Sequence, residues 1–258
     1  MPEGDTIAWH ANRIRPVLLG RVPDEITTHA RFALDRWPQR LHGRAVRDVA
    51  TRGKHLLLHF EGGLVLHSHL GMTGSWRVLG PEPRARRPPG PRAWIVIRAG
   101  AHEVVQLGGP LLELLTAARI GFDQRLAALG PDVLAPEFEF EGFLRRLRGE
   151  DLGRPIGDAL LDQRNLAGIG NIWKAEGCWE VGLDPWRRVG EVSDAEARAV
   201  VAAVRPRMFE SARHGPRAIR ARVYGRTGMP CPRCGGRIVS AGQGDANRTT
   251  YWCPVCQS

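Results

Sequence analysis

Four of the five cysteines stand in two close pairs near the end of the 258-residue chain. Cys231 and Cys234 form one C-x2-C pair, Cys253 and Cys256 form the other, and 18 residues separate the pairs. Two such turns present four thiolates that close a tetrahedral shell around Zn²⁺ and leave no position for a reactive water. The spacing predicts one structural zinc ion in a C-terminal ribbon. The fifth cysteine, Cys178, lies in an apolar helical stretch and is expected to be a buried core thiol.

The N-terminus is a second candidate for chemistry, because Met1 is followed by Pro2 and Glu3. Removal of Met1 would leave Pro2 with a free secondary amine. An α-amine titrates near 7.7–8.0 and a lysine near 10.4, so far more of the α-amine is a free nucleophile at neutral pH. A secondary amine that attacks a sugar aldehyde carbon forms a cationic iminium, which acts as an electron sink. Pro-Glu is also an ordinary chain start, so these residues alone leave both interpretations open.

Three further segments could contact an anion or a stacked base. Residues 166–171 read Leu-Ala-Gly-Ile-Gly-Asn and lead into a predicted helix, whose free amides and Asn171 suit a phosphate; a tight capped turn is the alternative. Lys54 precedes a predicted strand as either a phosphate contact or an exposed charge. Met72 lies between Gly71 and Gly74, where an apolar tip either inserts into a base stack or caps the core.

The charge balance favours an anionic partner. Lys and Arg number 37 and Asp and Glu 27, a net charge of +10, and only Lys54 and Lys174 are lysines. Nucleic acid is the first candidate, and a solubility surface is the alternative. The apolar fraction of 43% is that of a globular protein, and no apolar stretch is long enough to cross a membrane. Since the first residues are acidic, unlike a signal peptide, we expect a soluble cytoplasmic protein.

The elements that must position these residues change character along the chain. Apolar residues recur at helical spacing over 5–19, and residues 45–107 alternate as strands do, with a mobile Pro/Arg-rich loop expected at 79–92. This predicts an antiparallel β-sandwich with a leading helix. From about residue 120 helices are predicted. They are expected at 138–147, 155–161, 172–181 and 197–209, the last opened by a capping box at Ser193.

Four histidines in the strand region, His55, His59, His67 and His69, suggest a second metal site at first sight. Strand alternation instead places all four on one face of a sheet. We therefore interpret them as polar or packing residues of that face.

Taken together, the motifs resemble the formamidopyrimidine-DNA glycosylase / endonuclease VIII family over nearly the whole chain. The similarity is closest in the Gly-rich turn between helices and in the cysteine ribbon. The matching segments are Met-Pro-Glu-Gly at 1–4, Thr-Arg-Gly-Lys at 51–54, Ser-His-Leu-Gly-Met-Thr-Gly at 68–74, Leu-Gly-Pro-Asp at 129–132, residues 160–171, and Arg248 with residues 251–257.

The resemblance implies an α+β fold of three domains and a hinge. These are an N-terminal catalytic β-sandwich domain at 2–118, a hinge at 119–132, a helix–two-turn–helix DNA-binding domain at 133–224 and a zinc ribbon at 225–258. It also implies a base-excision repair enzyme that combines DNA glycosylase and apurinic/apyrimidinic lyase activities. Such an enzyme would act as a monomer on damaged double-stranded DNA, with structural zinc, no redox cofactor and no membrane association.

The resemblance also assigns roles to individual residues. Pro2 would attack C1′ of the damaged nucleoside and form a Schiff base, and Glu3 would protonate the sugar ring oxygen. Lys54 would serve base excision and contact phosphate. Arg248 would hold phosphates near the lesion and assist the second elimination, and Asn171 would bind phosphate. Met72 would fill the gap left by the everted base.

Two departures favour the endonuclease VIII branch, which prefers oxidised pyrimidines. The chain begins Pro-Glu-Gly-Asp-Thr, where the oxidised-purine branch has Pro-Glu-Leu-Pro-Glu. Residues 106–111 also lack the Arg-Arg-Phe-Gly-like loop of that branch, so only Met72 of its wedge residues is evident. Two alternative classes stay open on the residues alone. One is a non-catalytic zinc-ribbon DNA-binding protein, and the other is a zinc-ribbon protein of RNA processing or translation.

Overall fold

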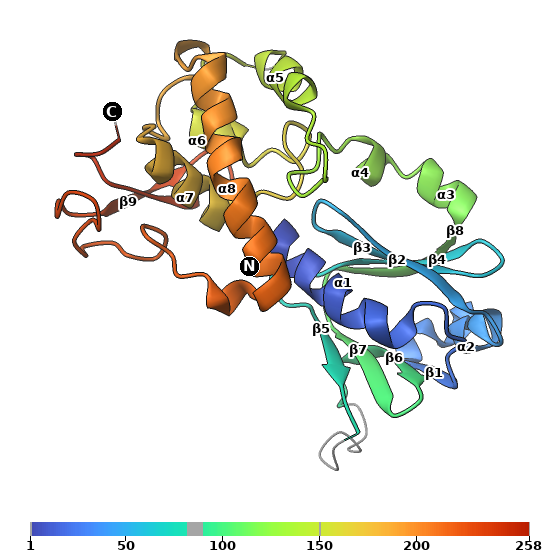
Figure 1. The fold of residues 1–258 in the computed structure, drawn as a ribbon. Coiled ribbons are helices and arrows are strands. Elements are labelled where there is room, and N and C mark those ends of the chain that lie inside the picture. The colour runs from blue at the N-terminus through green and yellow to red at the C-terminus, as the bar shows by residue number, and fades with distance from the viewer. Residues whose placement is uncertain (1, 82–89, 150, 258) are drawn as a thin grey trace. The chain divides into compact units, whose positions relative to one another are not determined.

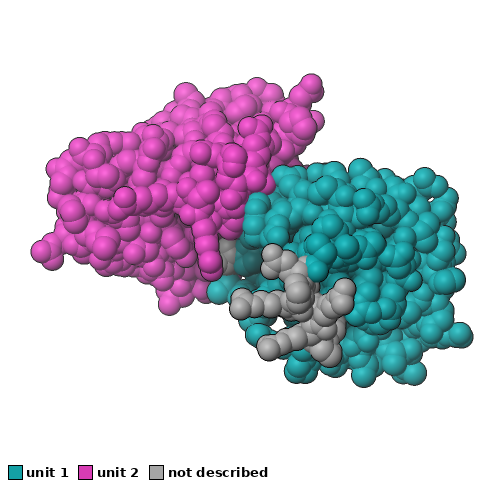
Figure 2. Space-filling view, turned by 60° about the horizontal axis from the view of Figure 1, so that its bottom comes forward, with its two compact units in different colours: residues 1–2, 6–127 teal, residues 3–5, 128–258 magenta. Residues whose placement is uncertain are grey.

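The computed structural model describes residues 2–81, 90–149 and 151–257. Most of the loop expected to be mobile, residues 82–89, lies outside these ranges. The chain divides into two compact units (Figure 2): unit 1 contains residues 1–2 and 6–127, and unit 2 contains residues 3–5 and 128–258. Throughout the described ranges, the helices are too short or too polar to span a bilayer.

Unit 1 is built on two four-stranded antiparallel sheets, as expected for a β-sandwich (Figure 1). The first sheet has the order β2 (Val46–Arg52), β3 (His55–Phe60), β4 (Leu64–His69) and β8 (Leu111–Thr116). The second has the order β1 (Glu25–Thr28), β6 (Ala93–Ala99), β7 (His102–Leu107) and β5 (Ser75–Leu79). The chain also forms short helices in this unit: η1 (Ala30–Asp35), α2 (Trp37–Leu41), α3 (Ala117–Gly121) and α4 (Gln124–Ala127).

The leading helix, α1 (Gly4–Leu18), shares one hydrophobic core with both sheets. Ile7, Ile14 and Leu18 are at most 1% exposed, which confirms the predicted amphipathic spacing. Strand alternation decides what faces this core: Leu56, Leu58 and Phe60 of β3 point into it and are at most 3% exposed. The intervening residues of β3 therefore lie on the opposite face of the sheet.

Unit 2 is mainly helical (Figure 1). Its helices are α5 (Phe140–Arg148), α6 (Ile156–Ala159), α7 (Asn171–Val181), η3 (Val189–Glu191), α8 (Asp194–His214) and η4 (Pro216–Ala218). The capping box is present, because Ser193 Oγ accepts from the Glu196 amide while the Glu196 carboxylate accepts from the Ser193 amide. Helix α7 packs on α8, and its residues are buried almost all round, as Cys178 illustrates with 0% exposure.

A two-stranded hairpin completes the C-terminal part of unit 2. Its strands are β9 (Val239–Gln243) and β10 (Arg248–Trp252), paired in register so that Arg248 lies opposite Gln243. Ile238 and two ribbon cysteines, Cys231 and Cys253, pack with Trp179 of α7 in a small hydrophobic cluster. The hairpin is thus anchored on the same helix that follows the Gly-rich turn.

Candidate functional site

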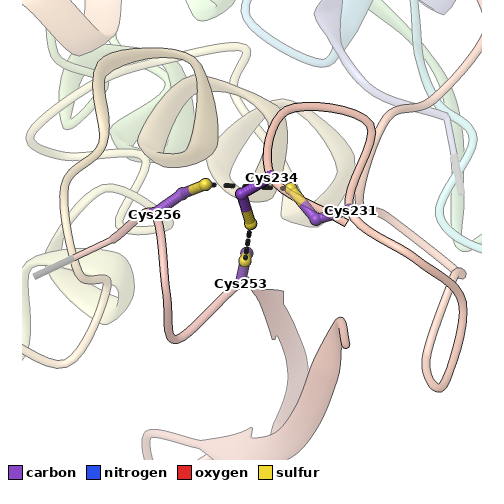
Figure 3. A group of neighbouring side chains, drawn as sticks. All are labelled: Cys231, Cys234, Cys253 and Cys256. Atoms are coloured by element: carbon purple, nitrogen blue, oxygen red, sulfur yellow. Dashed lines mark hydrogen bonds between the residues drawn. The ribbon is translucent and has the colours of Figure 1, made fainter. Parts of the chain in front are cut away.

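The four predicted zinc ligands come together at one point (Figure 3). Cys231 Sγ lies 3.9 Å from Cys256 Sγ, and Cys234 Sγ lies 3.6 Å from Cys253 Sγ. Tetrahedral zinc with Zn–S bonds of about 2.3 Å places its sulfurs about 3.8 Å apart, whereas a disulfide would need about 2.05 Å. The sulfur positions therefore fit a structural zinc ion, as the spacing predicts.

Neighbouring side chains hold this cysteine cluster against the helical part of unit 2. Trp179 Nε1 donates to Cys231 Sγ at 3.3 Å. Gln257 uses both ends of its amide: Oε1 accepts from the Cys253 amide at 2.8 Å, and Nε2 donates to Leu183 O at 2.9 Å. Such surrounding contacts orient metal ligands, so the ribbon is fixed to α7 and to the turn after it.

Glu3 occupies the N-terminus of helix α7. Its carboxylate accepts from the backbone amides of Gly170 (2.9 Å), Ile172 (2.7 Å) and Trp173 (3.3 Å), and the residue is 1% exposed. These are the free amides that suggested a phosphate site at residues 166–171. In this structure these amides bind the protein's own carboxylate, and the phosphate contact stays a prediction.

Glycines make this approach possible. A Cβ on Gly170 would lie 2.4 Å from Glu3 Cδ, closer than real Cβ atoms come. A Cβ on Gly4 would lie 3.0 Å from Gly168 Cα, and the Gly4 amide donates to Gly168 O at 2.8 Å. Gly168 itself has φ of +96°, which favours glycine. The Gly-rich turn and the chain start therefore fit each other backbone to backbone.

Asn171 and Lys174, one turn apart on α7, both bind the β9–β10 hairpin. Asn171 Nδ2 donates to Thr249 O at 2.7 Å, and Lys174 Nζ donates to Thr250 Oγ1 at 2.6 Å. Thr249 and Thr250 directly follow Arg248, which is exposed at the start of β10. The side chain of Asn171 is therefore turned toward the hairpin, and it is only 6% exposed.

Lys174 is a buried charged residue that no sequence motif indicated. The side chain is 0% exposed, and burial lowers the pKa of Lys174 to about 8. Its second partner is Gln243 Oε1 at 3.4 Å. The amino-acid composition could have drawn attention to it, because Lys174 is one of only two lysines in an arginine-rich chain.

A second buried charged residue that no sequence motif indicated, Glu176, binds the backbone of the basic segment after α8. Glu176 of α7 is 1% exposed and accepts from the backbone amides of Arg222, Val223 and Tyr224 at 2.9–3.1 Å. Its other oxygen pairs with Arg207 at 3.0 Å. A pocket opens beside this segment, lined by arginines that include Arg207 and Arg222. An arginine-lined concavity suits an anion.

In unit 1, Pro2 is partly buried and directly precedes Glu3 in the chain. Lys54 is partly buried in the turn between β2 and β3. Met72 is 68% exposed at the tip of the turn between β4 and β5. That turn is closed by the Gly74 amide, which donates to Leu70 O at 2.8 Å, and is backed by Pro110, whose Cδ would be 2.7 Å from a Cβ on Gly71. Residues 106–111 thus support the Met72 tip.

The four histidines do lie on one sheet face, as the strand registers show. They are more than packing residues, however. His55 and His67 are hydrogen-bonded to each other, and His67 is bonded to Glu113 of β8. Pairing between three strands brings these residues together, and β8 was not among the elements predicted at 45–107.

Models of three domain families match the chain in succession. They are described as the formamidopyrimidine-DNA glycosylase N-terminal domain (residues 1–107), the formamidopyrimidine-DNA glycosylase H2TH domain (residues 129–222) and the zinc finger found in FPG and IleRS (residues 228–258). The chain belongs to the formamidopyrimidine-DNA glycosylase family, which the sequence motifs had indicated.

Individual proteins agree with this assignment. The chain is 42% identical to "Probable endonuclease 8 2" of Streptomyces coelicolor, over 100% of this chain and 94% of the relative. It is 35% identical to "DNA-(apurinic or apyrimidinic site) lyase Nei2" of Mycolicibacterium smegmatis, covering 100% and 99%. Among solved structures, Lactococcus lactis Fpg in complex with N7-benzyl-Fapy-dG DNA shares the fold, with a TM-score of 0.84 at 22% identity and full coverage of both chains.

Proposed function

We propose that the chain is a bifunctional DNA glycosylase and abasic-site lyase that removes oxidised pyrimidines from double-stranded DNA through a Schiff base on Pro2. Family membership and the names of the relatives support the two activities. The departures at residues 4–6 and 106–111 support the pyrimidine preference. The observation that carries the mechanism is the Glu3 carboxylate, which three amides hold in one orientation directly after Pro2.

The proposed reaction begins when the amine of Pro2 attacks C1′ of the everted nucleotide and the bond from C1′ to the base breaks. The Glu3 carboxylate takes the proton that the Pro2 nitrogen loses and passes it to the ring oxygen, so the sugar opens and the iminium forms. The iminium then draws electrons from the C2′–H bond. Loss of that proton expels the 3′ phosphate, and a second elimination expels the 5′ phosphate. The product is a one-nucleotide gap with a phosphate on each side.

The remaining predicted residues bind and distort the DNA in this proposal. Arg248 and Lys54 hold backbone phosphates, and Asn171 fixes the hairpin that carries Arg248 and contributes to the phosphate site. Met72 enters the space of the flipped nucleotide, which offsets an unstacking cost of a few kcal/mol. The enzyme would act as a monomer in the cytoplasm on chromosomal DNA, and structural zinc would hold the ribbon.

Trapping with borohydride tests the proposal. A duplex with a central abasic site should become covalently bound to Met1-free protein, and peptide mapping should place the sugar on Pro2. Protein that retains Met1 should give no adduct, because the nitrogen of Pro2 is then an amide. A sugar located on another side chain would contradict the mechanism. Duplexes with thymine glycol, dihydrouracil or 8-oxoguanine then test the lesion preference.

The same experiment separates the second candidate function, a non-catalytic DNA-binding protein with a zinc ribbon. Such a protein would bind the abasic duplex without forming an adduct. Pro2, Glu3, Lys54 and Arg248 are all present in this chain, which favours the enzyme.

A further inference from the structure

A chain of hydrogen-bonded polar side chains, buried at His55 and His67, crosses the β3–β4–β8 sheet on the face opposite the core of unit 1. His55 Nδ1 lies 2.8 Å from His67 Nε2, and His67 Nδ1 lies 3.0 Å from Glu113 Oε1. Glu113 pairs with Arg125, which follows helix α3 along the chain and lies within α4. The proposed mechanism uses none of these side chains.

Arg125 anchors one end of this chain of side chains. Its guanidinium pairs with Glu113 and also with Asp123, whose carboxylate it meets through Nε at 3.0 and 3.1 Å. The hydrogen bonds from Arg125 hold the pKa of Asp123 well below its usual range. The Asp123 carboxylate is therefore an acceptor at neutral pH, and the same permanent cation also pairs with the Glu113 carboxylate.

The positions of the protons follow from that anchor. Because the Glu113 carboxylate only accepts, His67 Nδ1 must carry a hydrogen. Burial lowers the pKa of His67, so the ring is neutral and its Nε2 is a bare acceptor. His55 Nδ1 must then be the donor between the two rings, and burial, followed by His69 and His67, lowers the pKa of His55 to about 3. Each hydrogen bond of the network is therefore donated in the same direction, from His55 to His67 and from His67 to Glu113.

A metal ion is a poor explanation of the same cluster. Ligand atoms of His67, Glu113 and Asp123 lie within 4.8 Å of one another, which would suit a cation. However, both nitrogens of His67 are already in hydrogen bonds, and the Arg125 guanidinium lies against both carboxylates. A metal ion would therefore have to displace the Arg125 guanidinium from the two carboxylates.

The other end of the network, at His55, lies next to Lys54 and to the turn that carries Met72, two residues with roles in the proposed function. His55 directly follows Lys54, and its ring lies 4.8 Å from that of His69, measured between centroids. His69 Nδ1 accepts from the Gly71 amide at 3.3 Å, and Gly71 begins the turn that carries Met72. The charge of Lys54 also acts on His69. Burial is the main cause of the lowered pKa of His69, and the positive charge of Lys54 is the second cause.

We propose that His67 is a positioning residue for base excision. Through His55 and His69 it fixes Lys54 and the Met72 turn relative to each other, while Glu113 and Arg125 fix His67. This inference rests on the proposed function of Lys54 in base excision. It adds that a buried hydrogen-bond network on the outer face of the sheet, rather than the turn alone, sets the place of that lysine.

The first test needs no DNA. The chain has two lysines, and Lys174 is fully buried in unit 2, so it serves as an internal reference for acylation read by mass spectrometry. His67→Leu keeps a side chain of similar size but removes both hydrogen bonds of His67. The variant should speed the labelling of Lys54 by about threefold or more. His59→Leu is the matched control, because His59 lies on the same face of the sheet, on β3 opposite Val65 of β4, and outside the network. It should leave Lys54 labelling unchanged.

The second test is a double-mutant cycle. His67→Leu should slow excision of an oxidised pyrimidine about tenfold, and in a Lys54→Ala background it should cost nothing further. His67→Gln, whose amide keeps one donor and one acceptor, should restore most of the rate. Glu113→Leu, at the partly exposed end of the network, removes the acceptor of His67 Nδ1 and should have the effect expected of His67→Leu if that variant does not fold.

The outcomes separate this inference from the proposed function. Unchanged Lys54 labelling in both folded network variants would overturn the inference, and so would an equal loss of excision with and without Lys54. If the wild type excises no base at all, the proposed function fails. The labelling experiment would still decide whether the network positions Lys54.

Discussion

At the scale of single residues, the structure shows how the chain start and the Gly-rich turn are bound to each other. Three amides of the turn and of α7 bind Glu3, and a glycine at 170 leaves room for its carboxylate. The motif predicted an anion at this helix end. The sequence could not show which anion, because 167 residues separate Gly170 from Glu3 and no local pattern links them.

Gly170→Ala should therefore act through Glu3. Gly170 has φ of −131°, so alanine fits the backbone, but its Cβ would lie 2.6 Å from Glu3 Oε1. We expect a loss of about 1–3 kcal/mol in stability from the clash and at least a tenfold loss of base excision. Thermal unfolding and single-turnover excision measure the two effects. Gly121→Ala, with open space around the added Cβ, is the control. If Gly170→Ala excised bases as fast as the wild type, the orientation of Glu3 would have no part in the mechanism.

At the scale of elements, sequence patterns predicted what short-range rules govern. The amphipathic helix now bounded as Gly4–Leu18, the capping box at Ser193 and the two cysteine turns all depend on residues a few positions apart. Strand β8 was missed because Leu-Leu-Glu-Leu-Leu is apolar on both faces and shows no alternation. The contacts of Lys174 with Gln243 and Thr250 join residues 69 and 76 positions apart, which no local pattern reveals.

Lys174 should make stability depend on pH. Burial lowers the pKa of Lys174 from 10.5 to about 8, so between these values the unfolded chain binds more protons at this site than the folded protein. The free energy of unfolding should rise from pH 8 to pH 10.5, by at most about 3 kcal/mol from this lysine. Below pH 8 both states are charged and the cost of burial is present in full.

Lys174→Met should remove that rise and leave stability at pH 7.5 equal or higher. The substitution leaves no buried orphan, because Thr250 Oγ1 also donates to Gln243 Oε1 at 2.8 Å. Urea unfolding of the zinc-loaded protein at several pH values measures it, with Lys54→Met as a control that should retain the rise. A wild-type protein with flat stability across this window would show that the lysine is solvated.

At the scale of the whole molecule, zinc and the hairpin bring the predicted phosphate-binding arginine to a fixed place. Removal of zinc should unfold the ribbon, since the free energy of metal binding is part of the free energy of folding of such a small unit. A thiol reagent should then modify four cysteines, while Cys178 stays protected because burial raises the pKa of the Cys178 thiol to about 12. Reaction of a single cysteine after chelation would show that the ribbon stays folded without zinc, and reaction of all five would show that the ribbon and the helical core unfold together.

Loss of the ribbon should be visible in the salt dependence of DNA binding. The net charge of +10 makes binding sensitive to salt in any case, so the slope and not the affinity alone identifies a contact. Arg248→Ala should reduce the slope of log K against log salt by about 0.9, the release of one counterion. Arg237→Ala, on the ribbon but before β9, is the matched charge control and should leave the slope unchanged. Equal slopes for wild type and Arg248→Ala would remove Arg248 from the phosphate contacts, and the ribbon would then serve stability alone.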